Sequence, residues 1–159
     1  MEFLWSPWRY DYIASAGKTP PSCVFCVGQD SNTDEDRLIV HRGTHNFVIL
    51  NLFPYTAGHF MVAPYAHIAN IGESSPGETS EMMELAKRGI AALRRLYRPE
   101  GFNIGMNLGH AAGAGVREHL HLHIVPWWIG DANFLSIAGE TRVLPEELSV
   151  THRRMREVF

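Results

Sequence analysis

Three histidines at alternate positions are the residues of this chain whose type and spacing most clearly point to chemistry. They occur in the run His119-Leu120-His121-Leu122-His123-Ile124-Val125-Pro126. Because successive side chains of a β-strand point to opposite faces, the three imidazoles would share one face and the apolar residues between them the other. A structural histidine in a strand is usually single, and an unperturbed imidazole is titratable near neutrality. The pattern therefore predicts a strand with one face in the core and one face free for chemistry.

The two cysteines of the chain, Cys23 and Cys26, form a Cys-x-x-Cys element. Thiols this close in sequence are more often a redox pair or half of a metal site than a structural disulfide. The thioredoxin-like context of a redox pair is missing from the surrounding sequence, and two idle thiols are a third alternative. The spacing of the cysteines alone leaves these alternatives open.

Length and charge limit the classes of protein to which the chain can belong. With 159 residues, 45% of them hydrophobic, the sequence predicts one domain, residues 1–159, with a single buried core. The formal net charge is −3 and the one short basic run is Arg153-Arg154-Met155-Arg156, so the footprint of a polymeric nucleic-acid binder is missing. The chain has no basic segment followed by an apolar stretch at its start, and no run of about 18 uncharged apolar residues. These observations predict a cytoplasmic protein with no membrane partner.

Hydrophobic periodicity divides the chain into an arm, a core and an extension. Residues 1–36, which are rich in Pro, Gly, Ser and Asp, predict an irregular N-terminal arm that carries the cysteines. The predicted core, residues 37–128, holds strands over 37–41, 46–51, 59–63 and 103–108, the histidine strand, and an amphipathic helix over about 78–97. We expect the strand over 103–108 to pair with the histidine strand. Residues 129–159 form the predicted C-terminal extension, with a last helix from about Pro145.

Five motifs occur together in this chain. They are Cys23-x-x-Cys26, Asn51-Leu52-Phe53-Pro54-Tyr55-Thr56-Ala57-Gly58-His59, Pro64-Tyr65-Ala66-His67, Asn107 and the run of alternate histidines. Together they resemble the histidine triad (HIT) family of nucleotide hydrolases and transferases, over about residues 20–128. The start Leu4-Trp5-Ser6-Pro7-Trp8-Arg9 and the tail after Gly130-Asp131-Ala132-Asn133-Phe134 are similar to the bacterial branch that resembles diadenosine tetraphosphate phosphorylases.

The resemblance implies a fold and an assembly. The fold is α+β and HIT-like, with an antiparallel sheet of about five strands, one long helix packed on it, and a C-terminal extension. Family members pair as homodimers through the long helix and an edge strand. We therefore expect a homodimer in which an exposed edge of the sheet is covered.

The resemblance also implies that the histidine face transfers nucleotidyl groups. A neutral imidazole is a good nucleophile toward phosphorus and leaves readily, so it splits one transfer into two easier steps. The middle histidine, His121, would attack the α-phosphate of a nucleotide or dinucleoside polyphosphate, and water or another acceptor would resolve the nucleotidyl-histidine. His123, and His59 from the neighbouring strand, would donate hydrogen bonds to the phosphate oxygens. For His59 the alternative is a histidine that is hydrogen-bonded to backbone at the start of a strand.

Further residues would hold the substrate. Asn51 stands where the family usually has an acidic or amide residue at the ribose hydroxyls, and an amide both donates and accepts. Asn107 and the loop Gly113-Ala114-Gly115 would line the phosphate site, since glycines let backbone N–H groups approach an anion closely. The alternative for these glycines is a flexible hairpin loop. The loop also departs from the family, because many members carry Gln-Ser or Gln-Thr just before the triad.

The first histidine of the triad has a different implied role. Relatives with an N-terminal Cys-x-x-Cys bind zinc through the two cysteines, a histidine after the third strand and the first triad histidine. On this chain these residues are Cys23, Cys26, His67 and His119. Two thiolates and two imidazoles suit tetrahedral zinc, and a site with all four positions filled is structural rather than catalytic.

Two other function classes stay open from the sequence. In the first, the three strand histidines jointly hold a catalytic ion, and the chain is a metal-dependent enzyme or a metal-binding protein. In the second, the chain is a nucleotide-binding module whose turnover is too slow to matter. The sequence fixes neither the substrate nor the choice between water and orthophosphate as the acceptor.

Overall fold

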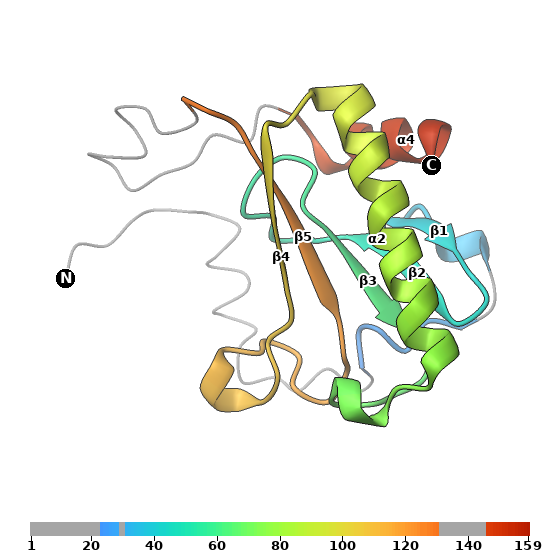
Figure 1. Cartoon of the computed structure of the whole chain (residues 1–159). Helices are drawn as coiled ribbons and strands as arrows, with labels where there is room; N and C mark the ends of the chain where they lie inside the picture. Colours follow the sequence, from blue (N-terminus) through green and yellow to red (C-terminus); the bar gives the residue numbers. More distant parts are fainter. Residues whose placement is uncertain (1–22, 29–30, 131–145) are drawn as a thin grey trace, which may run out of the picture.

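The computed structural model describes residues 23–28, 31–130 and 146–159 (Figure 1). Within these ranges five strands form one antiparallel sheet in the order β1-β2-β3-β5-β4. The strands are β1 (Ile39–Arg42), β2 (Asn46–Leu50), β3 (Phe60–Pro64), β4 (Gly101–Gly105) and β5 (Leu122–Trp127). The described helices are α2 (Pro76–Tyr97), α4 (Leu148–Val158) and the short 3-10 helices η1 (Ser31–Thr33), η2 (Ile71–Glu73) and η3 (His110–Ala112). The predicted α+β fold, with its antiparallel sheet and one long helix, is confirmed.

The predicted strand pairs are confirmed, but the histidine strand begins later than predicted. β1 and β2 form the expected antiparallel hairpin, and β4 pairs with β5. β5 starts at Leu122, so His119 and His121 precede the ladder. The reason is that the chain before β5 pairs with the loop after β3, where the Leu120 N–H donates to the Ile68 carbonyl oxygen at 2.7 Å. The alternation of side chains nevertheless continues through this extended segment.

Local sequence signals explain both ends of α2. The Ser75 hydroxyl accepts a hydrogen bond from the Glu78 N–H at 3.2 Å, and the Glu78 carboxylate accepts one from the Ser75 N–H at 2.7 Å. Pro76 occupies the first helical position, where no intrahelical hydrogen bond is lost. These signals place the helix start two residues before the predicted one. At the other end Arg98 adopts the left-handed conformation, with φ of 50°.

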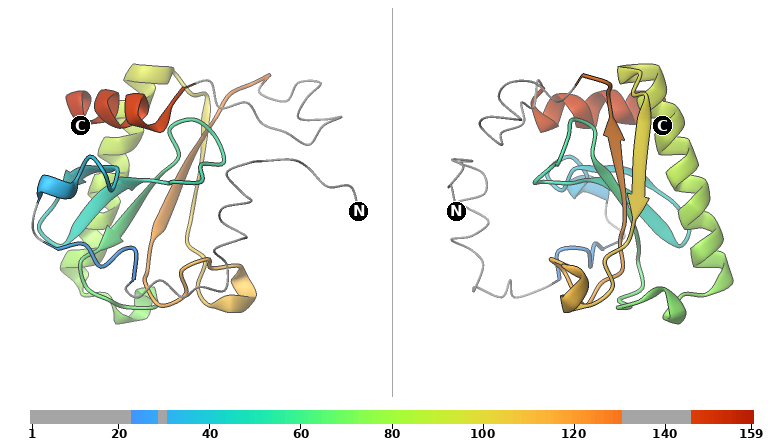
Figure 2. Two further views of the ribbon diagram at one scale, coloured as in Figure 1. Left: turned by 180° about the vertical axis from the view of Figure 1, so that it is seen from behind. Right: turned by 60° about the vertical axis from the view of Figure 1, so that its left-hand side comes forward.

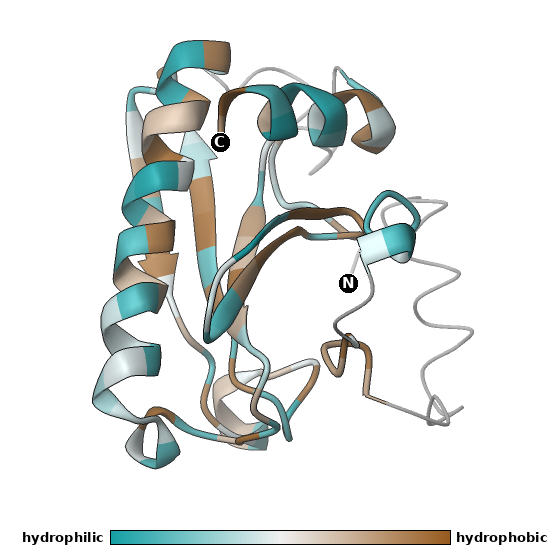
Figure 3. Cartoon of the chain, turned by 90° about the vertical axis from the view of Figure 1, so that its right-hand side faces the viewer, coloured by the Kyte–Doolittle hydropathy of each residue, from teal (hydrophilic) through white to brown (hydrophobic). Residues whose placement is uncertain are grey.

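The two faces of the sheet carry separate hydrophobic cores. α2 covers one face (Figures 1 and 2), and the core beneath it contains Leu50, Phe60, Val62, Met82, Leu85, Leu93, Leu120, Leu122 and Ile124. Figure 3 shows the hydrophobic segments of the strands and the alternation of hydrophobic and hydrophilic residues along α2. On the opposite face Phe25 and Val27 pack with Phe47, Ile49 and Met61. Leu120, Leu122 and Ile124, which alternate with the histidines, thus lie in the helix-side core, as predicted.

α4 confirms the predicted C-terminal helix. It begins at Leu148, whereas Pro145, the predicted start, lies outside the described residues. Its residue Met155 is fully buried in the helix-side core, and the buried His152 donates from Nε2 to the Ile39 carbonyl oxygen at 2.8 Å. These contacts attach α4 to α2 and to β1.

Much of the predicted arm and extension lies outside the described residues, and the predicted dimer involves a second chain. Residues 1–22 of the predicted arm and 131–145 of the predicted extension lie outside the described residues, and the division into arm, core and extension stays a prediction. The homodimer also stays a prediction, although β4 is an edge strand and its Ile104 is 47% exposed. In the ranges that the structure describes, every helix is too short or too polar to cross a bilayer.

The close contact of Gly89 in α2 with the sheet gives a stability prediction. A Cβ atom added there would lie 2.2 Å from Cζ of Phe60, which is itself fully buried. Replacing a helical Gly by Ala normally gains about 0.5–1 kcal/mol, but overpacking a core costs about 1–3 kcal/mol. We expect Gly89→Ala to lower the free energy of unfolding by about 1–2 kcal/mol in denaturant titration. Gly105→Ala, with no atom within 4 Å of the added Cβ, is the control, and equal stability of the two variants would contradict the tight contact.

Candidate active site and metal cluster

The pairing of β3 with β5 brings His59 beside His123. Met61 lies opposite His123 in the ladder, and His59 precedes Met61 by two residues, so the two histidines are diagonal neighbours on the face away from α2. Nε2 of His59 lies 2.9 Å from Nδ1 of His123. The predicted association of these two histidines from separate strands is therefore present in the structure.

The turn between β2 and β3 fixes where His59 enters the sheet. The buried Thr56 hydroxyl donates to the Pro126 carbonyl oxygen of β5 at 2.8 Å, which ties the turn to the histidine strand. Gly58 has φ of +79°, and a Cβ atom there would lie 2.8 Å from Cδ2 of Leu93 in α2. Glycine therefore meets both the backbone conformation and the close approach that this turn requires.

Hydrogen-bond partners fix the tautomers of the paired histidines. The Tyr55 N–H donates to Nδ1 of His59 at 3.1 Å, so Nδ1 is unprotonated and the neutral ring carries its proton on Nε2. This Nε2–H then donates to Nδ1 of His123, which leaves the neutral His123 with its proton on Nε2. His123 consequently keeps one N–H donor for a group outside the pair.

The tautomer of His121 is the opposite one. Its Nδ1 lies 2.8 Å from the carbonyl oxygen of His119, and because a carbonyl only accepts, the proton is on Nδ1. Nε2 of neutral His121 therefore carries a lone pair and no proton. The rings of His121 and His123 meet edge to face, with centroids 4.8 Å apart. A nucleophilic nitrogen and a neighbouring N–H donor are thus held side by side.

Burial keeps these three imidazoles neutral. Burial first, and then the charges of His123 and His121, lower the pKa of His59 to about 3. Burial, followed by the charge of His121, lowers the pKa of His123 to about 4. Burial also lowers the pKa of His121, more strongly than its hydrogen bond to the His119 carbonyl raises it. At neutral pH all three rings are therefore uncharged, and Nε2 of His121 keeps its lone pair.

Two aromatic residues at this site were missed by the sequence analysis. Phe25, from the arm, stacks on His121 with centroids 4.8 Å apart and planes at 29°. Tyr55, 56% exposed, lies over His59 with centroids 4.7 Å apart and reaches toward His123 at 6.2 Å. Phe25 lies within the Cys-x-x-Cys motif and Tyr55 within the motif from Asn51 to His59, and both motifs had been interpreted through their other residues. The sequence signal that could have indicated these contacts was the aromatic residue at each of the two positions.

The predicted substrate-binding residues differ in their hydrogen bonds and in their exposure. Asn51 is partly committed to its own turn, because its Oδ1 accepts from the Phe53 N–H at 2.9 Å and its Nδ2 lies 3.4 Å from Nδ1 of His59. Asn107, Gly113, Ala114 and Gly115 lie in the loop between β4 and β5, where all but the buried Ala114 are exposed. Gly113 has φ of +82° and ends η3. Their contact with a substrate stays a prediction.

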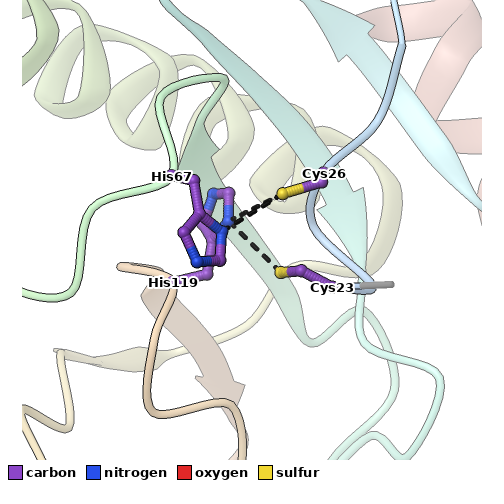
Figure 4. A group of neighbouring side chains, drawn as sticks. All are labelled: Cys23, Cys26, His67 and His119. Carbon is purple, nitrogen blue, oxygen red and sulfur yellow. Dashed lines mark hydrogen bonds between the residues drawn. The ribbon is translucent and has the colours of Figure 1, made fainter. Parts of the chain in front are cut away.

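Four predicted ligands form one compact cluster (Figure 4). One ligand atom from each of Cys23, Cys26, His67 and His119 lies within 4.8 Å of the others. Nδ1 of His119 is 3.4 Å from Sγ of Cys23, and Nδ1 of His67 is 3.2 Å from Sγ of Cys26. Figure 4 shows the cysteines on the arm, His67 on the loop after β3 and His119 on the segment before β5. The cluster therefore joins three segments that are distant in sequence.

The donor set of this cluster fits a metal ion such as zinc. Nε2 of His119 lies 2.8 Å from the Pro64 carbonyl oxygen, so the proton is on Nε2 and the Nδ1 lone pair faces the sulfur atoms. Burial, and then the Cys23 sulfur, raise the pKa of the Cys26 thiol, as expected for two sulfur atoms that share no counter-charge. Two sulfur and two nitrogen donors are a set that tetrahedral zinc accepts.

The same geometry disfavours a metal shared by the three strand histidines. Both ring nitrogens of His119 are engaged elsewhere, one toward the cysteine sulfur atoms and one by Pro64. His119 therefore has no ligand atom to share with His121 and His123. In the described ranges, the group of Cys23, Cys26, His67 and His119 is the one set of such side chains close enough to hold an ion.

Comparison with known proteins agrees with this architecture. The model of the HIT domain family matches residues 32–127. The chain is 39% identical to a protein named AP-4-A phosphorylase from Mycobacterium tuberculosis (strain H37Rv), in an alignment that covers 96% of this chain and 82% of the relative. A zinc-bound histidine triad family protein from Mycobacterium smegmatis has a similar structure, with a TM-score of 0.67, 30% identity and coverage of 86% and 92% of the two chains. A hypothetical histidine triad nucleotide-binding protein from Sulfolobus tokodaii is similar at 25% identity and a TM-score of 0.67, over 86% of this chain and 91% of that one. The chain belongs to the HIT family.

Proposed function

We propose that this protein is a nucleotidyl transferase that cleaves diadenosine tetraphosphate by phosphorolysis through a covalent nucleotidyl-His121 intermediate. The observation that carries the proposal is the tautomer of His121, whose Nδ1–H is held by the His119 carbonyl at 2.8 Å and whose Nε2 is left as a lone pair. The substrate is proposed from the AP-4-A phosphorylase to which the chain is 39% identical over most of its length.

In the first step the Nε2 lone pair of His121 attacks the α-phosphorus. The Nε2–P bond forms, the bond from phosphorus to the bridging oxygen breaks, and ATP leaves. His121 then carries a positive charge, and its Nδ1–H bond to the His119 carbonyl strengthens and stabilises it. The Nε2–H of His123 donates to the phosphate oxygens, while His59 holds His123 in that tautomer.

In the second step an oxygen of orthophosphate attacks the same phosphorus. The P–N bond breaks, ADP leaves, and the electron pair returns to Nε2, so His121 is again neutral. The sum of the two steps converts diadenosine tetraphosphate and orthophosphate into ATP and ADP. Water in place of orthophosphate would give AMP instead of ADP from the same intermediate.

Product analysis with labelled orthophosphate tests the proposal. We expect diadenosine tetraphosphate and ³³P-orthophosphate to give unlabelled ATP and labelled ADP. His121→Asn should lose several orders of magnitude in rate while binding the dinucleotide, because no second group offers the same covalent route. His45→Asn, an exposed histidine in the β1–β2 turn, is the matched control and should keep the wild-type rate.

Other products or intermediates would contradict specific parts of the proposal. AMP with ATP would replace orthophosphate by water as the acceptor. Tight dinucleotide binding without turnover would support the slow nucleotide-binding module. In acid-free quenching followed by mass spectrometry, the absence of an AMP adduct on His121 during turnover would reject the covalent route.

The neutral state required of His121 predicts the acid limb of the pH profile. The kcat/KM for the dinucleotide in a two-step mechanism reports only formation of the intermediate, at any orthophosphate concentration. Protonation removes the attacking lone pair, and burial lowers the pKa of His121 below its usual 6.5. We expect the midpoint of the acid limb of kcat/KM to lie below 6.5, with a drop of up to about tenfold per pH unit below that midpoint. A midpoint at or above 6.5 would show that another group limits the step.

The metal cluster is proposed to hold structural zinc. Cys23, Cys26, His67 and His119 would be the ligands, and the ion would fasten the arm to the segment before β5 without touching the reacting atoms. The related zinc-bound protein from Mycobacterium smegmatis supports the choice of metal.

Elemental analysis of two variants tests the zinc assignment. Wild-type protein should contain about one zinc per chain, and Cys26→Ser should lose it and melt at a lower temperature, because the free energy of metal binding contributes to folding. His121→Asn should retain the metal. If His121→Asn loses the ion and Cys26→Ser keeps it, the histidine-bound catalytic metal is correct and the structural assignment is wrong.

A further inference from the structure

We propose that Phe25 is a positioning residue for His121. Its ring forms a flat wall against one face of the imidazole and keeps Nε2 in the orientation for attack. This inference rests on the proposed role of His121 as the nucleophile.

The contacts of the His121 ring differ in geometry, and Phe25 is the one that stacks on its face. Nδ1 is held by the His119 carbonyl, which limits rotation of the ring about its Cβ–Cγ bond but contacts only one edge of the ring. His123 meets the ring edge to face, with planes at 71°. Phe25 stacks on it with planes at 29° and centroids 4.8 Å apart, an offset arrangement that favours one ring plane. Of these contacts, only that with Phe25 is nearly parallel to the imidazole.

Phe25 is itself held firmly. It is 4% exposed and packs with Phe47 and Met61 on the face of the sheet opposite α2. The turn that carries it is closed by the hydrogen bond from the Cys26 N–H to the Cys23 carbonyl oxygen at 3.1 Å. Both ends of this turn bear proposed metal ligands, so the ring is anchored from its core contacts and from its backbone.

The neighbouring residue shows that the arrangement is specific. Val24, the other residue between the two cysteines, is 51% exposed and points away from this core. The two positions therefore share the same loop and the same metal cluster, but only Phe25 contacts the triad, reaching His121 and also His119 at 5.5 Å. A variant of Val24 consequently controls for effects on the loop itself.

Steady-state kinetics of Phe25→Leu provide the first test. Leucine keeps the burial but removes the flat ring, so we expect unchanged zinc content and KM, and a kcat lower by about tenfold or more, since small misplacements of a reacting group cost this much. Phe25→Tyr, which keeps an aromatic ring, should recover most of the rate, and Val24→Ala should match wild type. A kcat of Phe25→Leu within twofold of wild type would overturn the inference. If Phe25→Leu does not fold, Phe25→Met takes its place with the same expectations.

Imidazole NMR of the protein without substrate provides a second test that does not depend on the proposed activity. At pH 8 the two-bond ¹H–¹⁵N spectrum of wild type should show His121 as a single Nδ1–H tautomer, identified by its loss in His121→Asn. In Phe25→Leu the ¹⁵N resonances of Nδ1 and Nε2 should move toward each other, as for a mixture of tautomers, and in Val24→Ala they should not. A change of ¹H shift alone follows from the lost ring current of Phe25 and counts as an unchanged signal. An unchanged His121 signal in Phe25→Leu overturns the inference whatever the substrate. A changed signal in a protein that does not turn over diadenosine tetraphosphate supports the positioning contact and rejects the proposed function alone.

Discussion

The three hydrogen-bonding groups of His119 are the constraint on which the metal cluster and the proposed active site both depend. Its Nε2–H is fixed by the Pro64 carbonyl oxygen, and its Nδ1 therefore faces the cysteine sulfur atoms. Its backbone carbonyl accepts from Nδ1 of His121 and leaves the other nitrogen of that ring unprotonated. One residue thus supplies a proposed metal ligand with its side chain and sets the tautomer of His121, the proposed nucleophile, with its main chain.

Burial determines the protonation state of the imidazoles in this arrangement. In water an imidazole would be partly protonated near neutrality, but His59 is 1% exposed and His121 is 6% exposed, and both have lowered pKa values. Because the charged forms are disfavoured, each neutral ring carries its one N–H proton on a defined nitrogen. The hydrogen bonds between the rings therefore run in one direction. This chain of hydrogen bonds runs from the Tyr55 N–H through His59 to His123, and it ends on a donor. The cost of burying polar rings is offset because the nitrogens inside the chain are hydrogen-bonded.

Sequence periodicity predicted what depends on local spacing, and it failed where distant segments meet. The alternation of His and Leu gave the two faces of the strand, and the 3.6-residue stripe gave α2. The family motifs gave the four clustered ligands. The late start of β5 was not predictable, because it follows from Leu120 pairing with the Ile68 carbonyl. The stacking of Phe25 and Tyr55 on the triad was missed for the same reason, since it arises from the path of the arm and the β2–β3 turn.

The period of an extended chain explains why metal cluster and active site lie so close together. Residues two apart point to the same side at a separation of roughly 6.6 Å, so a ligand at His119 places the next imidazole, His121, one side-chain width from the cluster. The space beside His121 must then be filled by the loop that brings the cysteines, and Phe25 is the residue of that loop that fills it. The described segment 23–28, which carries the cysteines, therefore also covers one face of the His121 ring. The position of this segment and the geometry of the proposed nucleophile are consequently parts of one structural unit.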